Sequence, residues 1–150
     1  MTKTTKNILI INGPNLNMLG KREPELYGNE SLDDIKTSLI NKSKKINLNI
    51  IFEQTNSEGE IVNIIQKAHN EILGLIINAG AYTHTSVAIH DALKLLDVPI
   101  IEVHLSNIFA REKFRQKSLI SSVALGIISG FGKESYELAF DFLAKSFKDN

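Results

Sequence analysis

The stretch Ile8-Leu9-Ile10-Ile11-Asn12-Gly13-Pro14-Asn15 joins four consecutive apolar residues directly to a polar turn. An apolar, β-branched run of this length is typical of a strand that is buried on both faces of a parallel sheet. The loop that follows continues to Gly28, whereas ordinary strand-to-helix loops have about 2–6 residues. Ligands of open α/β proteins bind beyond the carboxyl ends of the strands, so this loop is predicted to form part of a site.

Four more apolar runs have the length and continuity of strands buried on both faces. They are residues 48–52, 75–77, 98–103 and 124–128. Helical patterns follow, two of them opening at Ser31 and Ser57 with a capping-box pattern and the others covering 86–96 and 133–147. This alternation predicts an α/β fold, a flavodoxin-like three-layer sandwich with a five-stranded parallel sheet.

Composition restricts the classes of function. The 150 residues are expected to form a single domain. Basic and acidic residues both number 17, so no overall positive field is available to hold nucleic acid or an anionic membrane. The absence of cysteine excludes thiolate chemistry and agrees with a reducing compartment. With no segment of signal-peptide or membrane-spanning character, a cytoplasmic location is expected.

Several catalytic motifs are absent from the sequence. It contains neither G-x-G-x-x-G nor G-x-x-x-x-G-K-[ST], which hold dinucleotides and triphosphates, and no G-x-S-x-G nucleophile elbow. The four histidines lack the tight spacing of a metal site. The class of function that remains is acid–base chemistry, in which tyrosine, histidine and arginine act on a small oxygenated anion.

Polar residues follow four of the predicted strands, whose carboxyl ends meet at one edge of the sheet. They are Asn12 and Asn15, Gln54 and Thr55, residues 78–85 and residues 102–107. A single polar residue at a strand end is common, because loops are polar. Four ends that together supply asparagine, histidine and glutamate, with arginines close behind the fourth, favour a functional site.

Glu102 and His104 are two residues apart on a predicted strand, so their side chains are expected to share a face. The carboxylate can fix the tautomer of the imidazole and support its protonated form, which makes His104 a candidate general acid. A surface ion pair is the alternative, and the otherwise apolar strand disfavours it.

Arg22 and Tyr27 lie in the long loop, where a guanidinium beside a phenol would lower a phenol pKa that is ordinarily about 10. Tyr27 is therefore a candidate general base, and the alternative is an apolar anchor that closes the loop. Asn15 and Asn78 are candidate donors to an oxyanion or to hydroxyls, although asparagines beside turns often bond to their own backbone.

Cationic residues follow the fourth strand. Arg111 and Arg115 would point the same way on a helix, where one would bind substrate oxygens; a solvated charged face is the alternative. Backbone N–H groups near Leu105 and Ser106 are candidates to bind a carboxylate.

The third loop has more capping groups than one helix start needs, so His84 is predicted to face the site. Asp91 is a candidate partner of Arg22 or Arg115, and His90 is expected on the helix surface.

Four motifs lie in order along the chain. They are Asn12-Gly13-Pro14-Asn15-Leu16-Asn17, Gly20-Lys21-Arg22-Glu23-Pro24 with Tyr27-Gly28, Asn78-Ala79-Gly80-Ala81-Tyr82-Thr83-His84-Thr85-Ser86, and Glu102-Val103-His104-Leu105-Ser106-Asn107 with Ala110-Arg111-Glu112 and Phe114-Arg115. From about residue 7 to 143 the chain closely resembles the type II 3-dehydroquinate dehydratases. The resemblance implies a hydro-lyase of the shikimate pathway, which converts 3-dehydroquinate to 3-dehydroshikimate by anti elimination through an enolate, without cofactor or metal.

The resemblance also implies roles for catalytic residues. Tyr27 resembles the base that removes the proton beside the ketone, and Arg22 resembles the residue that keeps it ionised within a closing lid, at about residues 16–28. Asn15 would stabilise the enolate through a water. His104, oriented by Glu102, resembles the acid that helps the hydroxyl to depart.

Substrate-binding roles follow from the same resemblance. Asn78, His84 and Arg115 resemble binders of substrate hydroxyls, the backbone of Leu105 and Ser106 resembles that of the carboxylate site, and Asp91 matches a position that contacts substrate or supports a neighbouring subunit's site. Family members usually assemble as dodecamers built from trimers, so a homo-oligomer is expected.

Two other classes of protein remain as alternatives. A flavodoxin-like binding or signalling domain would carry a flavin or an acidic cluster after the first strand, which Asn12-Gly13-Pro14-Asn15 does not fit. A regulatory assembly protein would keep the fold and lack turnover.

Overall fold

Each of the five predicted apolar runs forms a strand in the computed structural model, which describes residues 5–21, 25 and 29–148. The strands are β1 (Asn7–Asn12), β2 (Asn49–Gln54), β3 (Gly74–Asn78), β4 (Ile100–His104) and β5 (Gly126–Ser129). They pair in parallel in the order β2-β1-β3-β4-β5, the flavodoxin-like order. The predicted fold class is confirmed.

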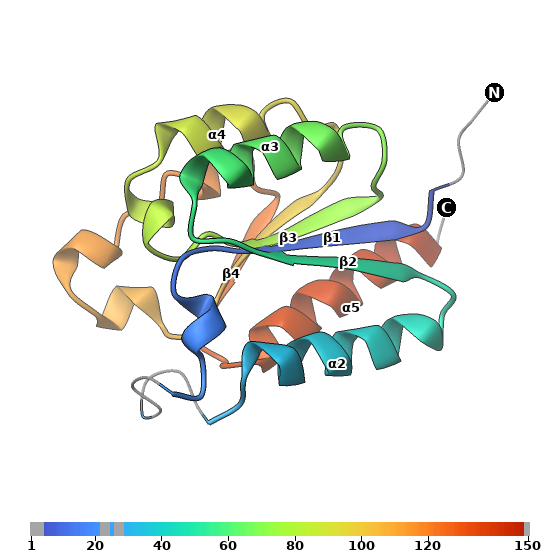
Figure 1. Cartoon of the computed structure of the whole chain (residues 1–150), viewed down its shortest axis with the longest axis horizontal. Coiled ribbons are helices and arrows are strands. Elements are labelled where there is room, and N and C mark those ends of the chain that lie inside the picture. Colours follow the sequence, from blue (N-terminus) through green and yellow to red (C-terminus); the bar gives the residue numbers. More distant parts are fainter. Residues whose placement is uncertain (1–4, 22–24, 26–28, 149–150) are drawn as a thin grey trace.

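Helices cover both faces of this sheet (Figure 1). One face carries α2 (Leu32–Lys44) and α5 (Glu134–Lys148), and the other carries α3 (Glu58–Ala68) and α4 (Val87–Leu93). The pattern predicts a third helix up to residue 96, but α4 ends at Leu93. The last turn is tighter, because the N–H groups of Leu95 and Leu96 donate to carbonyls three residues back. Among the described residues, no helix is long and apolar enough to cross a membrane.

The inner strand β1 divides the core into two clusters. Ile8 and Ile10 pack with residues of α2 and α5, whereas Leu9 and Ile11 pack with residues of α3 and α4. All four side chains are almost completely buried. Successive side chains of a strand point to opposite faces, so one continuous apolar run supplies both layers.

The expectation that all five strands are buried on both faces is wrong for β2 and β5. Residues of β2 alternate between exposed and half-buried, and those of β5 are exposed or half-buried. Both are edge strands, with a neighbour on one side only. A run of apolar residues indicates a strand, but it does not give the strand's place in the sheet.

The two capping-box patterns have different outcomes. Ser31 and Asp34 exchange both side-chain-to-backbone hydrogen bonds at the start of α2. At the start of α3 the Ser57 hydroxyl accepts from the N–H of Glu60, but the Glu60 carboxylate accepts from the hydroxyl of Thr55 instead. The second pattern therefore forms half of a capping box.

The loop after β1 packs directly against the loop after β3. The N–H of Gly13 donates to the carbonyl of Asn78 at 2.8 Å. A Cβ atom on Gly13 would lie 2.3 Å from the backbone oxygen of Ala79, so only glycine allows this approach. This contact joins the two loops that form one wall of the candidate site.

Candidate active site

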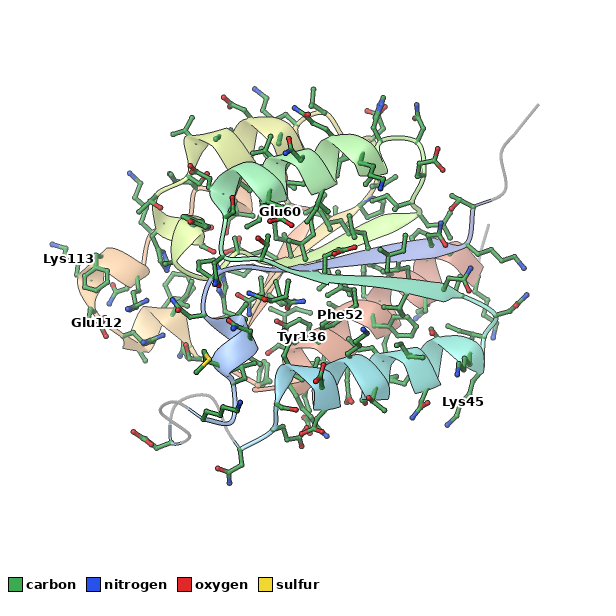
Figure 2. The ribbon with its side chains drawn as sticks, viewed as in Figure 1. Lys45, Phe52, Glu60, Glu112, Lys113 and Tyr136 are labelled. Atoms are coloured by element: carbon green, nitrogen blue, oxygen red, sulfur yellow. The ribbon has the colours of Figure 1, made fainter. Side chains whose placement is uncertain are left out.

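A cavity of about 180 Å³ lies at the carboxyl ends of β1, β3 and β4. The predicted site residues that line it are Asn15, Asn78, His84, His104, Leu105, Ser106 and Arg115, together with Arg111. The segment with Glu112 and Lys113 projects from this end of the sheet (Figure 2). The structure thus brings together polar residues from three loops that are far apart in the sequence.

Two predicted residues that the structure describes do not line this cavity. Glu102 lies behind His104 with no exposed surface. Asp91 is exposed on α4. Arg22 and Tyr27 lie outside the described residues.

The predicted pair of Glu102 and His104 is present at the end of β4. Nε2 of His104 lies 2.5 Å from Oε2 of Glu102, and both side chains are buried. A surface ion pair, the alternative reading of the motif, is excluded by this burial. With Nε2 bound to the carboxylate, Nδ1 is the ring nitrogen left to exchange a proton with a molecule in the cavity.

Two serines that the sequence did not single out hold the Glu102 carboxylate. The Ser121 hydroxyl donates to Oε1 at 2.5 Å, and the Ser118 hydroxyl lies 2.9 Å from Oε2 and 3.1 Å from Oε1. Burial raises the pKa of Glu102, but hydrogen bonds from His104, Ser121 and Ser118 outweigh it, so the net pKa is lowered. The carboxylate is therefore ionised at neutral pH and lies within hydrogen-bond distance of the imidazole of His104. These serines are 16 and 19 residues from Glu102, and no short motif links them to it.

Two histidines hold the segment that carries Ser118. Nδ1 of His84 lies 2.7 Å from the carbonyl oxygen of Lys117, and Nδ1 of His90 lies 2.7 Å from that of Leu119. Because a carbonyl only accepts, each Nδ1 carries the hydrogen. His90, which was expected on the helix surface, is half-buried in this contact. His84 also lines the cavity, as predicted.

The two arginines reach the cavity from separate short turns. Arg111 follows the 3₁₀ turn Ile108–Ala110 and Arg115 ends the 3₁₀ turn Lys113–Arg115, so the helical arrangement considered for them is wrong. Nη1 of Arg111 donates to the Ser106 hydroxyl at 3.3 Å.

Arg115 is held by its neighbours in the sequence. Its Nε donates to Oε2 of Glu112 at 2.6 Å, and its guanidinium lies 5.0 Å from the centre of the Phe114 ring. The hydrogen bond from Arg115 lowers the pKa of Glu112. Glu112, rather than Asp91, is therefore the ionic partner of Arg115.

Asn15 enters the cavity from a left-handed backbone conformation, with φ of 69°. Its N–H donates to the side-chain oxygen of Asn56 at 3.0 Å. Asn56 belongs to the loop after β2 and was not singled out from the sequence. It fixes the backbone of Asn15 and leaves the Asn15 carboxamide to the cavity.

Asn78 is 3% exposed at the floor of the cavity. Its Oδ1 accepts from the N–H of Gly80 at 3.2 Å, and its Nδ2 donates to the hydroxyl of Tyr136 at 3.0 Å. Asparagines beside turns often bond to nearby backbone, and the side-chain oxygen of Asn78 does so through Gly80. Tyr136, on α5, is a further residue that the sequence did not mark.

The donor set of this site is nitrogen-rich and cationic. In the part of the chain that the structure describes, no group of three or more histidine, cysteine, aspartate or glutamate side chains is arranged to hold a metal ion. Arginine, histidine and amide donors instead suit an oxygen-rich anion.

Comparison with known proteins gives one consistent result. The family described as Dehydroquinase class II matches residues 6–144. The chain is 50% identical to the 3-dehydroquinate dehydratase of Prochlorococcus marinus (strain NATL1A) over 142 residues, which are 95% of this chain and 98% of that protein. It is 49% identical to the 3-dehydroquinate dehydratase of Rhizobium johnstonii over 139 residues, with 93% and 96% covered. The crystal structure of type II dehydroquinase from Propionibacterium acnes superposes with a TM-score of 0.90 at 43% identity, covering 95% of this chain and 98% of that one.

Proposed function

This chain belongs to the class II dehydroquinase family, and on that premise we propose that it dehydrates 3-dehydroquinate to 3-dehydroshikimate, a step of the shikimate pathway. The main support is the buried Glu102–His104 pair. The His104 imidazole lines a cavity whose other walls carry cationic and amide donors. This arrangement suits removal of water from a polyhydroxylated carboxylate.

His104 is the general acid in this proposal. The base removes a proton from the carbon beside the ketone, and the electron pair of that C–H bond forms an enolate. The enolate then expels the hydroxyl on the next carbon, which leaves as water with a proton from the imidazolium. Glu102 stabilises the imidazolium, and the reaction is an anti elimination that needs no cofactor.

Tyr27 is the base, and Arg22 keeps the phenol ionised within a lid. Both assignments rest on the match of their motif to the family, since the two residues lie outside the described part of the chain. A guanidinium close to a phenolate favours the ionised form by direct charge attraction.

The remaining residues bind the substrate and the enolate. Asn15 stabilises the enolate through a water, and Asn78, His84 and Arg115 bind the hydroxyls. The backbone of Leu105 and Ser106 binds the carboxylate. Support comes from the position of all six around one cavity, at the carboxyl ends of three neighbouring strands.

A homo-oligomer, a dodecamer built from trimers, completes the proposal. Asp91 is exposed on α4 and does not line the cavity of its own chain, which suits a role at a neighbouring subunit's site. Exposed apolar side chains also gather around a groove at the β5 edge, and exposed apolar patches mark protein contacts. They are Phe109, Ile127, Phe131 and Leu138.

The test is an ultraviolet assay of purified protein with 3-dehydroquinate and EDTA, which follows the conjugated enone of the product. We expect turnover in the presence of the chelator, and a loss of about 10²-fold or more in kcat for Tyr27→Phe and for His104→Ala. Circular dichroism and gel filtration establish that the variants are folded and assembled. Absence of turnover in assembled wild-type protein would overturn the proposal and favour a regulatory assembly protein.

A further inference from the structure

Tyr136 is a buried phenol that the proposed chemistry does not use. It projects from α5 into the layer between that helix and the sheet (Figure 2). Its hydroxyl donates to Oδ1 of Asn12 at 2.6 Å and accepts from Nδ2 of Asn78 at 3.0 Å. Asn12 and Asn78 are register partners at the ends of β1 and β3. One hydroxyl therefore bridges the ends of the two central strands beneath the cavity.

Backbone groups at both ends fix the direction of this hydrogen-bond chain. The carbonyl of Glu53 only accepts, so Nδ2 of Asn12 faces it at 3.0 Å and Oδ1 of Asn12 faces Tyr136. Tyr136 must then donate to Asn12 and accept from Asn78. At the far end the N–H of Gly80 only donates, so it takes Oδ1 of Asn78. Each amide in the chain thus has one permitted orientation.

Tyr136 keeps its proton at every working pH. Burial raises the pKa of the phenol far above its ordinary value, and the hydrogen bond from Asn78 offsets only part of this effect. The hydroxyl is therefore always available as the donor to Asn12, and the direction of the chain does not change with pH.

We propose that Tyr136 is a positioning residue, which holds the Asn78 carboxamide so that its second N–H is offered to an oxygen of the substrate. The inference rests on the proposed function of Asn78 as a binder of substrate hydroxyls. An amide nitrogen has two N–H groups, and Tyr136 takes one of them. With the amide flipped, Asn78 would meet the Gly80 N–H with its own N–H groups, so the observed orientation makes Asn78 a donor toward the cavity.

Removal of the Tyr136 hydroxyl releases this constraint. In Tyr136→Phe the Asn78 nitrogen loses its acceptor, and the bond from Gly80 to Oδ1 alone is left to hold the carboxamide, so its second N–H is no longer fixed toward the substrate. A single hydrogen bond corresponds to about tenfold in an equilibrium constant. We expect KM to rise about tenfold with little change in kcat, because the contact is made in both the substrate complex and the transition state.

The experiment compares three single variants and one double variant with wild type by steady-state kinetics with 3-dehydroquinate. Phe140→Leu is the matched control, because Phe140 is 1% exposed, lies one turn further along α5 and packs in the same core cluster without a polar atom. Asn78→Ala and the double variant Asn78→Ala with Tyr136→Phe close a double-mutant cycle.

The expected result is a raised KM for Tyr136→Phe, an unchanged KM for Phe140→Leu, and no further rise when Tyr136→Phe is added to Asn78→Ala. Equal KM values for Tyr136→Phe and Phe140→Leu would overturn the positioning role, and so would additive effects in the cycle. In either case turnover by wild-type enzyme would still support the proposed function. Absence of wild-type turnover would instead overturn both. If Tyr136→Phe does not fold, Tyr136→Met removes the same hydroxyl with a flexible apolar side chain, and an unchanged KM there contradicts the inference.

Discussion

Nε2 of His104 lies 2.5 Å from Oε2 of Glu102, whose side chain is completely buried. In Glu102→Gln the amide keeps the shape of the carboxylate but removes the negative charge beside His104, the proposed general acid. We expect kcat to fall about 10²-fold or more with a small change in KM, measured by the enone assay.

The control for this variant is Glu137→Gln. Glu137 also accepts from a serine hydroxyl, that of Ser38 at 2.7 Å, and lies between α2 and α5 away from the cavity. It should leave kcat unchanged. A Glu102→Gln enzyme with wild-type kcat would show that the carboxylate charge has no part in catalysis.

Hydrogen bonds from His104, Ser121 and Ser118 make Glu102 a source of pH-dependent stability. The pKa of Glu102 is lowered from its ordinary value of 4.5, so its contribution is present above pH 4.5 and is lost as pH falls through the lowered folded pKa. Replacing both serines by alanine should reduce the free energy of unfolding at pH 7 by about 1.5–3 kcal/mol per hydroxyl. In the double variant the folded pKa of Glu102 lies closer to the unfolded value than it does in wild type. The stability deficit should therefore shrink below pH 4.5, where the carboxyl becomes protonated in both proteins.

Urea unfolding at pH 7 and at several values below pH 4.5 measures this deficit. Ser38→Ala is the control, since it removes a serine-to-carboxylate hydrogen bond at a distance from Glu102. A deficit that stays constant across the whole pH range would mean that the serines act by packing alone.

Glycine 13 sets the distance between the loops after β1 and β3. A Cβ atom there would lie 2.3 Å from the backbone oxygen of Ala79, and backbone cannot move aside as a side chain does. We expect Gly13→Ala to destabilise the protein by about 1–3 kcal/mol and to lower kcat/KM. Gly126→Ala is the control, because a Cβ atom at Gly126 meets nothing within 4 Å. Thermal unfolding of the two variants side by side makes the comparison, and equal melting temperatures would contradict the crowding argument.

Local patterns were sufficient for the strands of this fold and for the pairing of Glu102 with His104. Continuous apolar runs located all five strands, and the two-residue spacing of Glu102 and His104 placed both side chains on one face of β4. Burial at the sheet edges was not predictable, because β2 and β5 have the same apolar character as the inner strands.

Contacts between distant segments were beyond the reach of the sequence. Ser118, Ser121 and Tyr136 are ordinary residues of a loop and a helix, and only the folded chain brings them to Glu102 and Asn78. The separation between Tyr136 and Asn12 is 124 residues, so no spacing rule connects them.

Asn15 combines a backbone role and a side-chain role, and two substitutions separate them. Its φ of 69° favours glycine or asparagine, so Asn15→Gly should fold like wild type, whereas Asn15→Ala adds about 1 kcal/mol or more of backbone strain. Both lack the carboxamide proposed to stabilise the enolate, so kcat should fall to a similar extent in both, about 10²-fold. Asn47→Gly, at a φ of 61° in an exposed turn, is the control and should change neither stability nor kcat. Wild-type kcat in Asn15→Gly, measured with the enone assay beside thermal unfolding, would restrict Asn15 to a backbone role.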